Sequence, residues 1–313
     1  MLQVVLAGLA QGVVVGLIGL GCWLAGRATG LLPLAHGDLM VFSVVAGVLL
    51  VVGRTPSTAD LGVLASLSLV APALGSGVLL AAAISLVTVL PVMRRGPAGR
   101  LGPAVALRWV AGSLAAGLLM RTAVTTLLPV PGLAAPDPVH LDSLLGENSL
   151  IGFGHSQIES RAIVVLLIGL ALGWLTELVA VRSRWGRSVR AVCDDHLAAQ
   201  LCGIDVRRVV IALFMIIGAL AGAAGLLAAP GRNLSVEDGV LLGLQGIAAA
   251  RLAGSGGVSK VMIAGLAVGV VQSLSAYALG AGFYSVAPLV MLLMVLVARP
   301  IHDRRPTVVR SPA

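Results

Sequence analysis

Long apolar runs alternate with short polar connections along the chain. A helix needs about 20 apolar residues to cross the hydrocarbon core of a bilayer, at about 1.5 Å rise per residue. Runs close to this length are Leu2–Ala25, Leu31–Val52, Leu61–Val92, Leu101–Met120, Ala162–Val181, Val209–Ala229, Leu234–Ala250, Val261–Ala281 and Phe283–Ala298. The third is divided near Pro72 and Gly75, so residues 31–93 include candidate half-helices. The pattern predicts an all-α, polytopic transmembrane helical bundle, one domain over residues 1–313, with about eight to ten membrane segments and at least one broken or re-entrant segment.

The composition supports a membrane class and excludes several others. The chain is 58% hydrophobic and only 11% charged, whereas soluble domains carry about 25% charged residues. The net charge of +8 does not indicate nucleic-acid binding, because the arginines cluster in short connections and no aromatic residues interleave with them as a stacking platform. Cys22, Cys193 and Cys202 lack metal-ligand spacing and are interpreted as small thiols. No cofactor or metal is expected.

The charges of the connections predict the orientation of the chain. Three segments are rich in arginine: residues 94–100, 182–208 and the tail 299–313. Positively charged connections stay on the cytoplasmic face, so 94–100, 182–208 and 299–313 are all expected to be cytoplasmic. The connection 121–161 is acidic and proline-rich, and is expected to be extracytoplasmic. A cytoplasmic N-terminus follows if residues 2–93 make four crossings.

A histidine and an aspartate interrupt the second apolar run, in Leu32-Pro33-Leu34-Ala35-His36-Gly37-Asp38. Pro33 removes a backbone donor, and Gly37 permits unusual backbone angles. Irregular backbone and ionisable residues at membrane depth occur against protein or a water-filled cavity, and are usually functional. We hypothesise that Pro33, His36, Gly37 and Asp38 line or gate a translocation path. The alternative is an interfacial turn in which His36 and Asp38 are merely solvated.

The polar segment 182–208 contains residues that favour the start and the end of a short helix, as a docking helix requires. Asp194 and Asp195 suit the start of a short helix, His196–Leu201 contains good helix formers, and Gly203 suits its C-terminal stop. The segment is longer than a simple connector requires, which favours docking of a soluble partner. An ordinary connector between two membrane helices is the alternative.

Other patterns indicate packing rather than chemistry. Small residues recur at four-residue spacing, which lets helices approach closely in lipid; these are Gly8, Gly12, Gly16, Gly218, Gly222, Gly239, Gly243, Gly265 and Gly269. Gly254–Lys260 is not a phosphate loop, because Ser259 stands where glycine must precede the lysine. Glu237 and Asp238 fit a helix N-terminus, with a solute contact as the alternative.

At these motifs the chain resembles the membrane permease subunits of branched-chain amino acid ABC transporters. Leu34–Leu39 is similar to the family's Phe-Ala-His-Gly-Glu element. Gly186–Ala191, followed by Asp195, Ala198, Leu201, Gly203 and Ile204, is similar to the family's segment that contacts the ATPase. Ala219–Leu227 is similar to the Ala/Gly-rich helix that follows, and Arg251–Gly257 to a degraded form of its Gly-rich turn.

The resemblance implies the function and the partners. It implies a permease that forms a path with a second homologous permease, bound by two cytoplasmic ABC ATPase subunits and supplied by an extracytoplasmic solute-binding protein. It implies a multi-pass protein of the bacterial inner (plasma) membrane in which ATP hydrolysis belongs to the partners, so this chain is expected not to be an enzyme. The ATPase-coupling residues are then Gly186, Arg187, Arg190, Asp195, Ala198, Leu201 and Gly203.

Some positions depart from the family pattern and leave the solute open. Pro33 stands where the family has Asn, Leu90–Arg95 replaces a longer family motif, and Arg251 is added to the Gly-rich turn. A branched-chain amino acid is the first choice of solute, and urea or a short amide is the second.

Two other function classes are weighed against this one. An ion-gradient-driven secondary carrier could use Asp38 as a coupling site, but such carriers often have paired broken helices, and the second half shows no clear matching break. An intramembrane enzyme would need scattered residues to converge, because no catalytic set is apparent.

Overall fold

The computed structural model describes residues 2–30, 33–52, 63–89, 103–127, 150–153, 156–229, 235–254, 256–280 and 282–298, and the fold is given for these. The elements are α1 (Leu2–Thr29), α2 (His36–Val52), α3 (Val63–Ile84), η1 (Ser85–Val89, a π-helical turn), α5 (Pro103–Leu127), β1 (Leu150–Phe153), β2 (Ser156–Glu159), α6 (Ser160–Arg182), α7 (Arg184–Asp194), α8 (His196–Leu201), α9 (Val206–Ala228), α10 (Asp238–Ala253), α11 (Val258–Leu279) and α12 (Phe283–Ala298).

The predicted all-α transmembrane bundle is confirmed, with one short β-hairpin added. Helical stretches in α1, α3 with η1, α6, α9 and α11 are long and apolar enough to cross a membrane, and α2 and α12 are shorter apolar helices. The described residues contain nine apolar helices of 16 residues or more, within the predicted range of segments. Strands β1 and β2 pair antiparallel, with Leu150 opposite Glu159.

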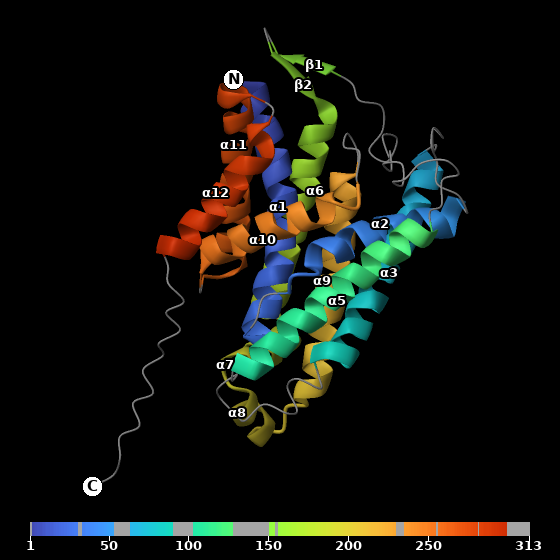
Figure 1. Cartoon of the computed structure of the whole chain (residues 1–313), viewed down its shortest axis with the longest axis vertical. Coiled ribbons are helices and arrows are strands. Elements are labelled where there is room, and N and C mark those ends of the chain that lie inside the picture. The colour runs from blue at the N-terminus through green and yellow to red at the C-terminus, as the bar shows by residue number, and fades with distance from the viewer. Residues whose placement is uncertain are drawn as a thin grey trace.

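The two ends of the bundle are marked by different elements (Figure 1). The hairpin and the start of α1 lie at one end, and α7 and α8 lie at the other. Helix α6 joins the two ends, since it follows β2 directly and leads into α7. Helix α10 runs across the middle of the bundle and packs against both α1 and α2.

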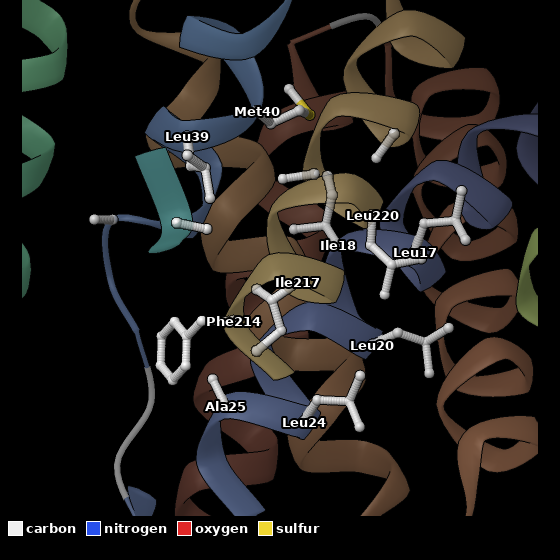
Figure 2. Close-up of a cluster of buried hydrophobic side chains, with 14 of the residues drawn as sticks. Leu17, Ile18, Leu20, Leu24, Ala25, Leu39, Met40, Phe214, Ile217 and Leu220 are labelled. Carbon is white, nitrogen blue, oxygen red and sulfur yellow. The ribbon is translucent and has the colours of Figure 1, made fainter. Parts of the chain in front are cut away.

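The core lies where α1, α2 and α9 meet. Leu17, Ile18 and Leu20 of α1 are fully enclosed, together with Met40 of α2 and Ile217 of α9. Figure 2 shows these side chains as part of one cluster of buried residues. Because lipid covers apolar surface as well as protein does, the dense packing of this interior is what holds the helices together.

The packing of six helices repeats with inverted orientation. Helix α1 packs against α11 and α10, and α9 packs against α3 and α2 in the same way. In this comparison α1, α10 and α11 correspond to α9, α2 and α3. The contact of α2 with α3 matches that of α10 with α11, and each repeat contacts the other through α1 with α9 and through α10 with α2. Helix α1 runs toward the α7–α8 end, whereas α9 runs away from it. This is the arrangement of inverted-topology repeats found in many transporters.

Glycines form the close contacts between α1 and α11 and between α9 and α3, as the four-residue spacing of small residues predicted. A Cβ added to Gly12 of α1 would lie 2.7 Å from the Cα of Leu266 in α11. A Cβ added to Gly222 of α9 would lie 2.9 Å from the carbonyl oxygen of Ala73 in α3. At both contacts the backbones themselves touch, which only glycine permits.

One expectation about the first half of the chain is wrong, and the condition attached to another is not met by the described residues. The third apolar run is not divided, because α3 continues through Pro72; membrane helices tolerate proline where neighbouring groups satisfy the freed backbone. The described residues between 2 and 89 form three membrane-length or near-length helices, so the four crossings on which a cytoplasmic N-terminus depended are not seen in this part of the chain. The start of α1 lies instead beside the hairpin (Figure 1).

The expected 121–161 loop is shorter than its sequence suggests. Helix α5 continues through Arg121 to Leu127, and β2 and α6 occupy its last residues. The tail 299–313, the basic connection 94–100 and most of the acidic loop lie outside the described residues.

Candidate functional site

The predicted break between the first two apolar runs is present. Residues 33–35 are not helical, and α2 begins at His36. The alternative of a solvated interfacial turn is wrong, because only 3% of His36 and 8% of Asp38 is exposed. The Nε2 atom of His36 lies against Gly21 of α1 and forms no hydrogen bond within the described residues.

Gly37 brings the start of α2 into backbone contact with α10. A Cβ added to Gly37 would overlap the carbonyl oxygen of Gly239 and lie 2.8 Å from the Cα of Gly243. Gly37 is not among the described glycines with positive φ, so close approach, and not unusual backbone angles, is why it is needed. The expectation of no matching break is also wrong. Helix α10 has only 16 residues, and its first turn contacts the first turn of α2 through Gly239 and Gly37.

Asp38 forms an ion pair with Arg121, a residue expected from the sequence to lie in the 121–161 connection. The Nε of Arg121 donates a 2.9 Å hydrogen bond to Oδ1 of Asp38. Gly117, one turn earlier in α5, leaves room for the carboxylate, since a Cβ there would lie 2.6 Å from Oδ2. The lack of proline and glycine between Met120 and Leu127 was the available signal that the helix continues through Arg121. A charged residue inside a membrane segment generally has a charged partner.

The Asp38–Arg121 pair should show strong coupling in a double-mutant cycle. We expect Asp38→Asn and Arg121→Gln each to lower stability by about 1–3 kcal/mol, because each leaves a charge without its partner. The double variant should lose less than the sum of the two. Thermal unfolding of the four proteins in detergent measures this, and strictly additive losses would contradict the pairing.

The polar segment forms two short helices, α7 and α8, joined by Asp195; residues 183–205 are called the α7–α8 segment below. Ser183 caps α7, because its Oγ accepts a 2.8 Å hydrogen bond from Gly186 N. Asp195 caps α8 through Ala198 N, at 3.1 Å, as predicted. Gly203 follows α8 at φ +79°, the left-handed conformation expected of a helix stop.

The residues that the resemblance assigned to ATPase coupling divide into two groups. Gly186 is buried against the carbonyl groups of Val179 and Ala180 in α6, so it fixes α7 to the bundle. The exposed group is Arg187, Arg190, Asp195, Ala198, Leu201 and Gly203. Leu201 is 90% exposed, although leucine is normally covered by protein or lipid.

The α7–α8 segment contacts the end of α1 through interactions that were not predicted from the sequence. Arg27 of α1 donates from Nη2 to Oδ1 of Asp194 at 3.1 Å, and its guanidinium lies 5.3 Å from the ring centroid of Trp23. Trp23 in turn donates to the carbonyl oxygen of Gly254 at 2.9 Å. One cluster thus joins the segment, the end of α1 and the α10–α11 connection.

The two cysteines of this segment should react very differently. Burial raises the pKa of Cys193 to about 11, with Arg27 lowering it and Asp194 raising it to smaller extents, whereas Cys202 is exposed. A raised pKa leaves little thiolate, about 0.1% at pH 8, and thiolate is the nucleophile. Iodoacetamide at pH 8 should therefore modify Cys202 first, and Cys193 should react about ten-fold faster per pH unit up to about pH 10. Mass spectrometry of the peptides measures both, and equal rates at pH 8 would contradict it.

Comparison with known protein families identifies the family of this chain. A model of the branched-chain amino acid transport system permease component family matches residues 4–298. The chain belongs to this family. It is a permease component of this family and a multi-pass membrane protein, with several helices long and apolar enough to cross a membrane.

Individual relatives cover a smaller part of this permease. LivH of Salmonella typhimurium, a high-affinity branched-chain amino acid transport system permease protein, is 32% identical over 169 residues, 52% of this chain and 54% of that protein. BraD of Pseudomonas aeruginosa, of the same description, is 32% identical over 160 residues, 50% of each chain. FrcC of Rhizobium meliloti, a fructose import permease protein, is 35% identical over 80 residues, 26% of this chain and 21% of that protein. The chain thus spans about half the length of the first two relatives.

Proposed function

We propose that this permease forms the membrane path of an ABC importer for branched-chain amino acids or a similar small polar solute. Its partners would be a second homologous permease, two cytoplasmic ATPase subunits and an extracytoplasmic solute-binding protein, in a bacterial inner membrane. The observation that carries the proposal is the α7–α8 segment: two capped helices, anchored by Gly186, with Leu201 90% exposed at the end of the bundle.

The anchoring of this segment supports a coupling role. Force applied by an ATPase to α8 would reach α1 through the Asp194–Arg27 ion pair. It would also reach the α10–α11 connection through Trp23 and Gly254. In this proposal residues 182–208 and 299–313 are cytoplasmic, and the hairpin end, within 121–161, faces the solute-binding protein.

We propose that Pro33, His36, Gly37 and Asp38 gate the path rather than line an open channel. His36 and Asp38 are buried, and Asp38 is closed off by Arg121 and by the glycines of α5 and α10. The short helices α2 and α10 begin at this point, so a relative movement of the two halves would open it. Normal uptake by a stably expressed His36→Ala variant would contradict a role for His36.

A pull-down of the tagged chain from its native membrane tests the assembly. We expect an ATPase and a second permease among the co-purifying proteins identified by mass spectrometry. Recovery of the chain alone, with uptake driven by a proton gradient in proteoliposomes, would favour a secondary carrier instead. In the assembled system, competition of leucine, urea and acetamide for ATP-driven uptake distinguishes the two solute classes.

A further inference from the structure

A cavity of about 430 Å³ lies inside the bundle on the side of α7. It is walled by α1, α6 and α9 and closed at one end by α7, and none of the predicted path residues lines it. This volume is typical of a site for a small organic ligand. Most of its walls are leucine, valine and alanine side chains, so the ligand must be largely apolar.

The length of the cavity matches one leaflet of a bilayer. On α6 its lining runs from Leu172 to Val181, which is nine helical steps or about 14 Å. On α9 it runs from Leu213 to Ala223, about 15 Å. Half of a hydrocarbon core of about 30 Å is also about 15 Å. The cavity is therefore long enough for most of one acyl chain.

The cavity opens sideways, toward the bilayer. Its α6 wall includes Leu175, Val179 and Val181, which are all exposed on the surface of the bundle. Helices α6 and α9 contact each other only sparsely, so α1 forms the floor between them. A ligand would enter along the membrane plane, which is the route open to a lipid.

Basic and amphipathic side chains gather at the α7 end of the cavity. Arg27 and Arg190 line it there, beside Trp23 and Trp185. Glu177 is the one acidic residue among the described residues of the lining, and its Oε1 accepts a 3.0 Å hydrogen bond from Ser259. Arg27 is paired with Asp194, but in the described part of the chain the Arg190 guanidinium has only a 3.5 Å hydrogen bond to the carbonyl of Val181. Tryptophans favour the membrane interface, and basic pockets between membrane helices bind anionic headgroups.

We propose that this cavity binds one acyl chain of an anionic phospholipid, with the lipid phosphate on Arg190. The apolar walls, the leaflet-length shape, the lateral opening and the basic end are together what such a lipid requires. The inference depends only on the membrane location and not on the proposed solute or ATPase. It gives Arg190 a second partner besides the ATPase.

Photocrosslinking of the full-length protein in lipid nanodiscs tests the site. The probe is phosphatidylglycerol with a diazirine in the middle of one acyl chain, and phosphatidylcholine with the same chain is its matched control. We expect wild-type crosslinks to concentrate on the facing surfaces of α6 and α9. Ala223→Phe, which places a ring inside the cavity and narrows it, should lower them at least ten-fold, and Ala171→Phe, an exposed α6 position outside the lining, should not. Arg190→Gln should abolish the preference for phosphatidylglycerol.

Three results would overturn the proposal. Wild-type crosslinks spread evenly over the exposed helices would show that no site exists, whether or not Ala223→Phe folds. Equal labelling of the wild type by phosphatidylcholine and phosphatidylglycerol would show that the site does not select an anionic headgroup. Displacement of the probe by millimolar leucine, but not by glycerol phosphate, would assign the cavity to the solute instead.

Discussion

Replacing Leu201 by aspartate is expected to separate the ATPase from the permease and to lower ATP-driven uptake at least ten-fold. Leu201 is 90% exposed at the tip of α8, so its substitution removes almost no contact within this chain. Burying an exposed leucine side chain in a pocket on a partner contributes about 1.5–3 kcal/mol, and a charge in that pocket adds a desolvation cost. Pull-down yield and proteoliposome uptake measure the two effects.

The neighbouring residue supplies the control for this experiment. Gln200 is also exposed on α8, one residue earlier and about 100° around the helix. Gln200→Asp introduces the same charge while leaving Leu201 in place, so we expect less than a three-fold effect on uptake. If both variants bind the ATPase normally, the α7–α8 segment is a connector and the coupling proposal is wrong. If both lose it, charge and not the leucine contact is decisive.

The α8 helix shows which features a sequence can specify. Its predicted bounds, His196–Leu201, agree with the structure because both of its ends are set by local chemistry. Asp195 caps its first turn, and Gly203 supplies the left-handed stop within a few residues. Apolar runs of membrane length are equally local, which is why the bundle was predictable although Pro72 was misread as a division.

The surroundings of Asp38 show what could not be predicted from the sequence. Its partner Arg121 is 83 positions away, and nothing near either residue indicates that they meet. The contact of Gly37 with Gly239 likewise joins distant segments whose pairing depends on the inverted packing of the two halves. The motif around His36 was therefore identifiable, whereas its burial, its neighbours and the true role of its glycine required the fold.

Gly37→Ala is expected to be strongly destabilising although it adds only one methyl group. The added methyl would overlap the Gly239 carbonyl oxygen, which is backbone and cannot rotate away as a side chain does. Overpacking of this kind typically costs about 1–3 kcal/mol, and we expect the upper part of that range because two helix starts must separate. The same displacement would move Asp38 away from Arg121, so uptake should fall together with the melting temperature in detergent.

Gly75→Ala is the matched control, because the same methyl is added where there is space for it. Gly75 lies inside α3 with no neighbouring atom within 4 Å of an added Cβ. Alanine should there be neutral or stabilising by about 0.5–1 kcal/mol, through its better helix propensity. Opposite shifts in melting temperature for the two variants would attribute the effect at Gly37 to contact between α2 and α10. A Gly37→Ala protein that melts and transports like the wild type would mean that the two short helices do not meet in the working transporter, and the gate would have to lie elsewhere.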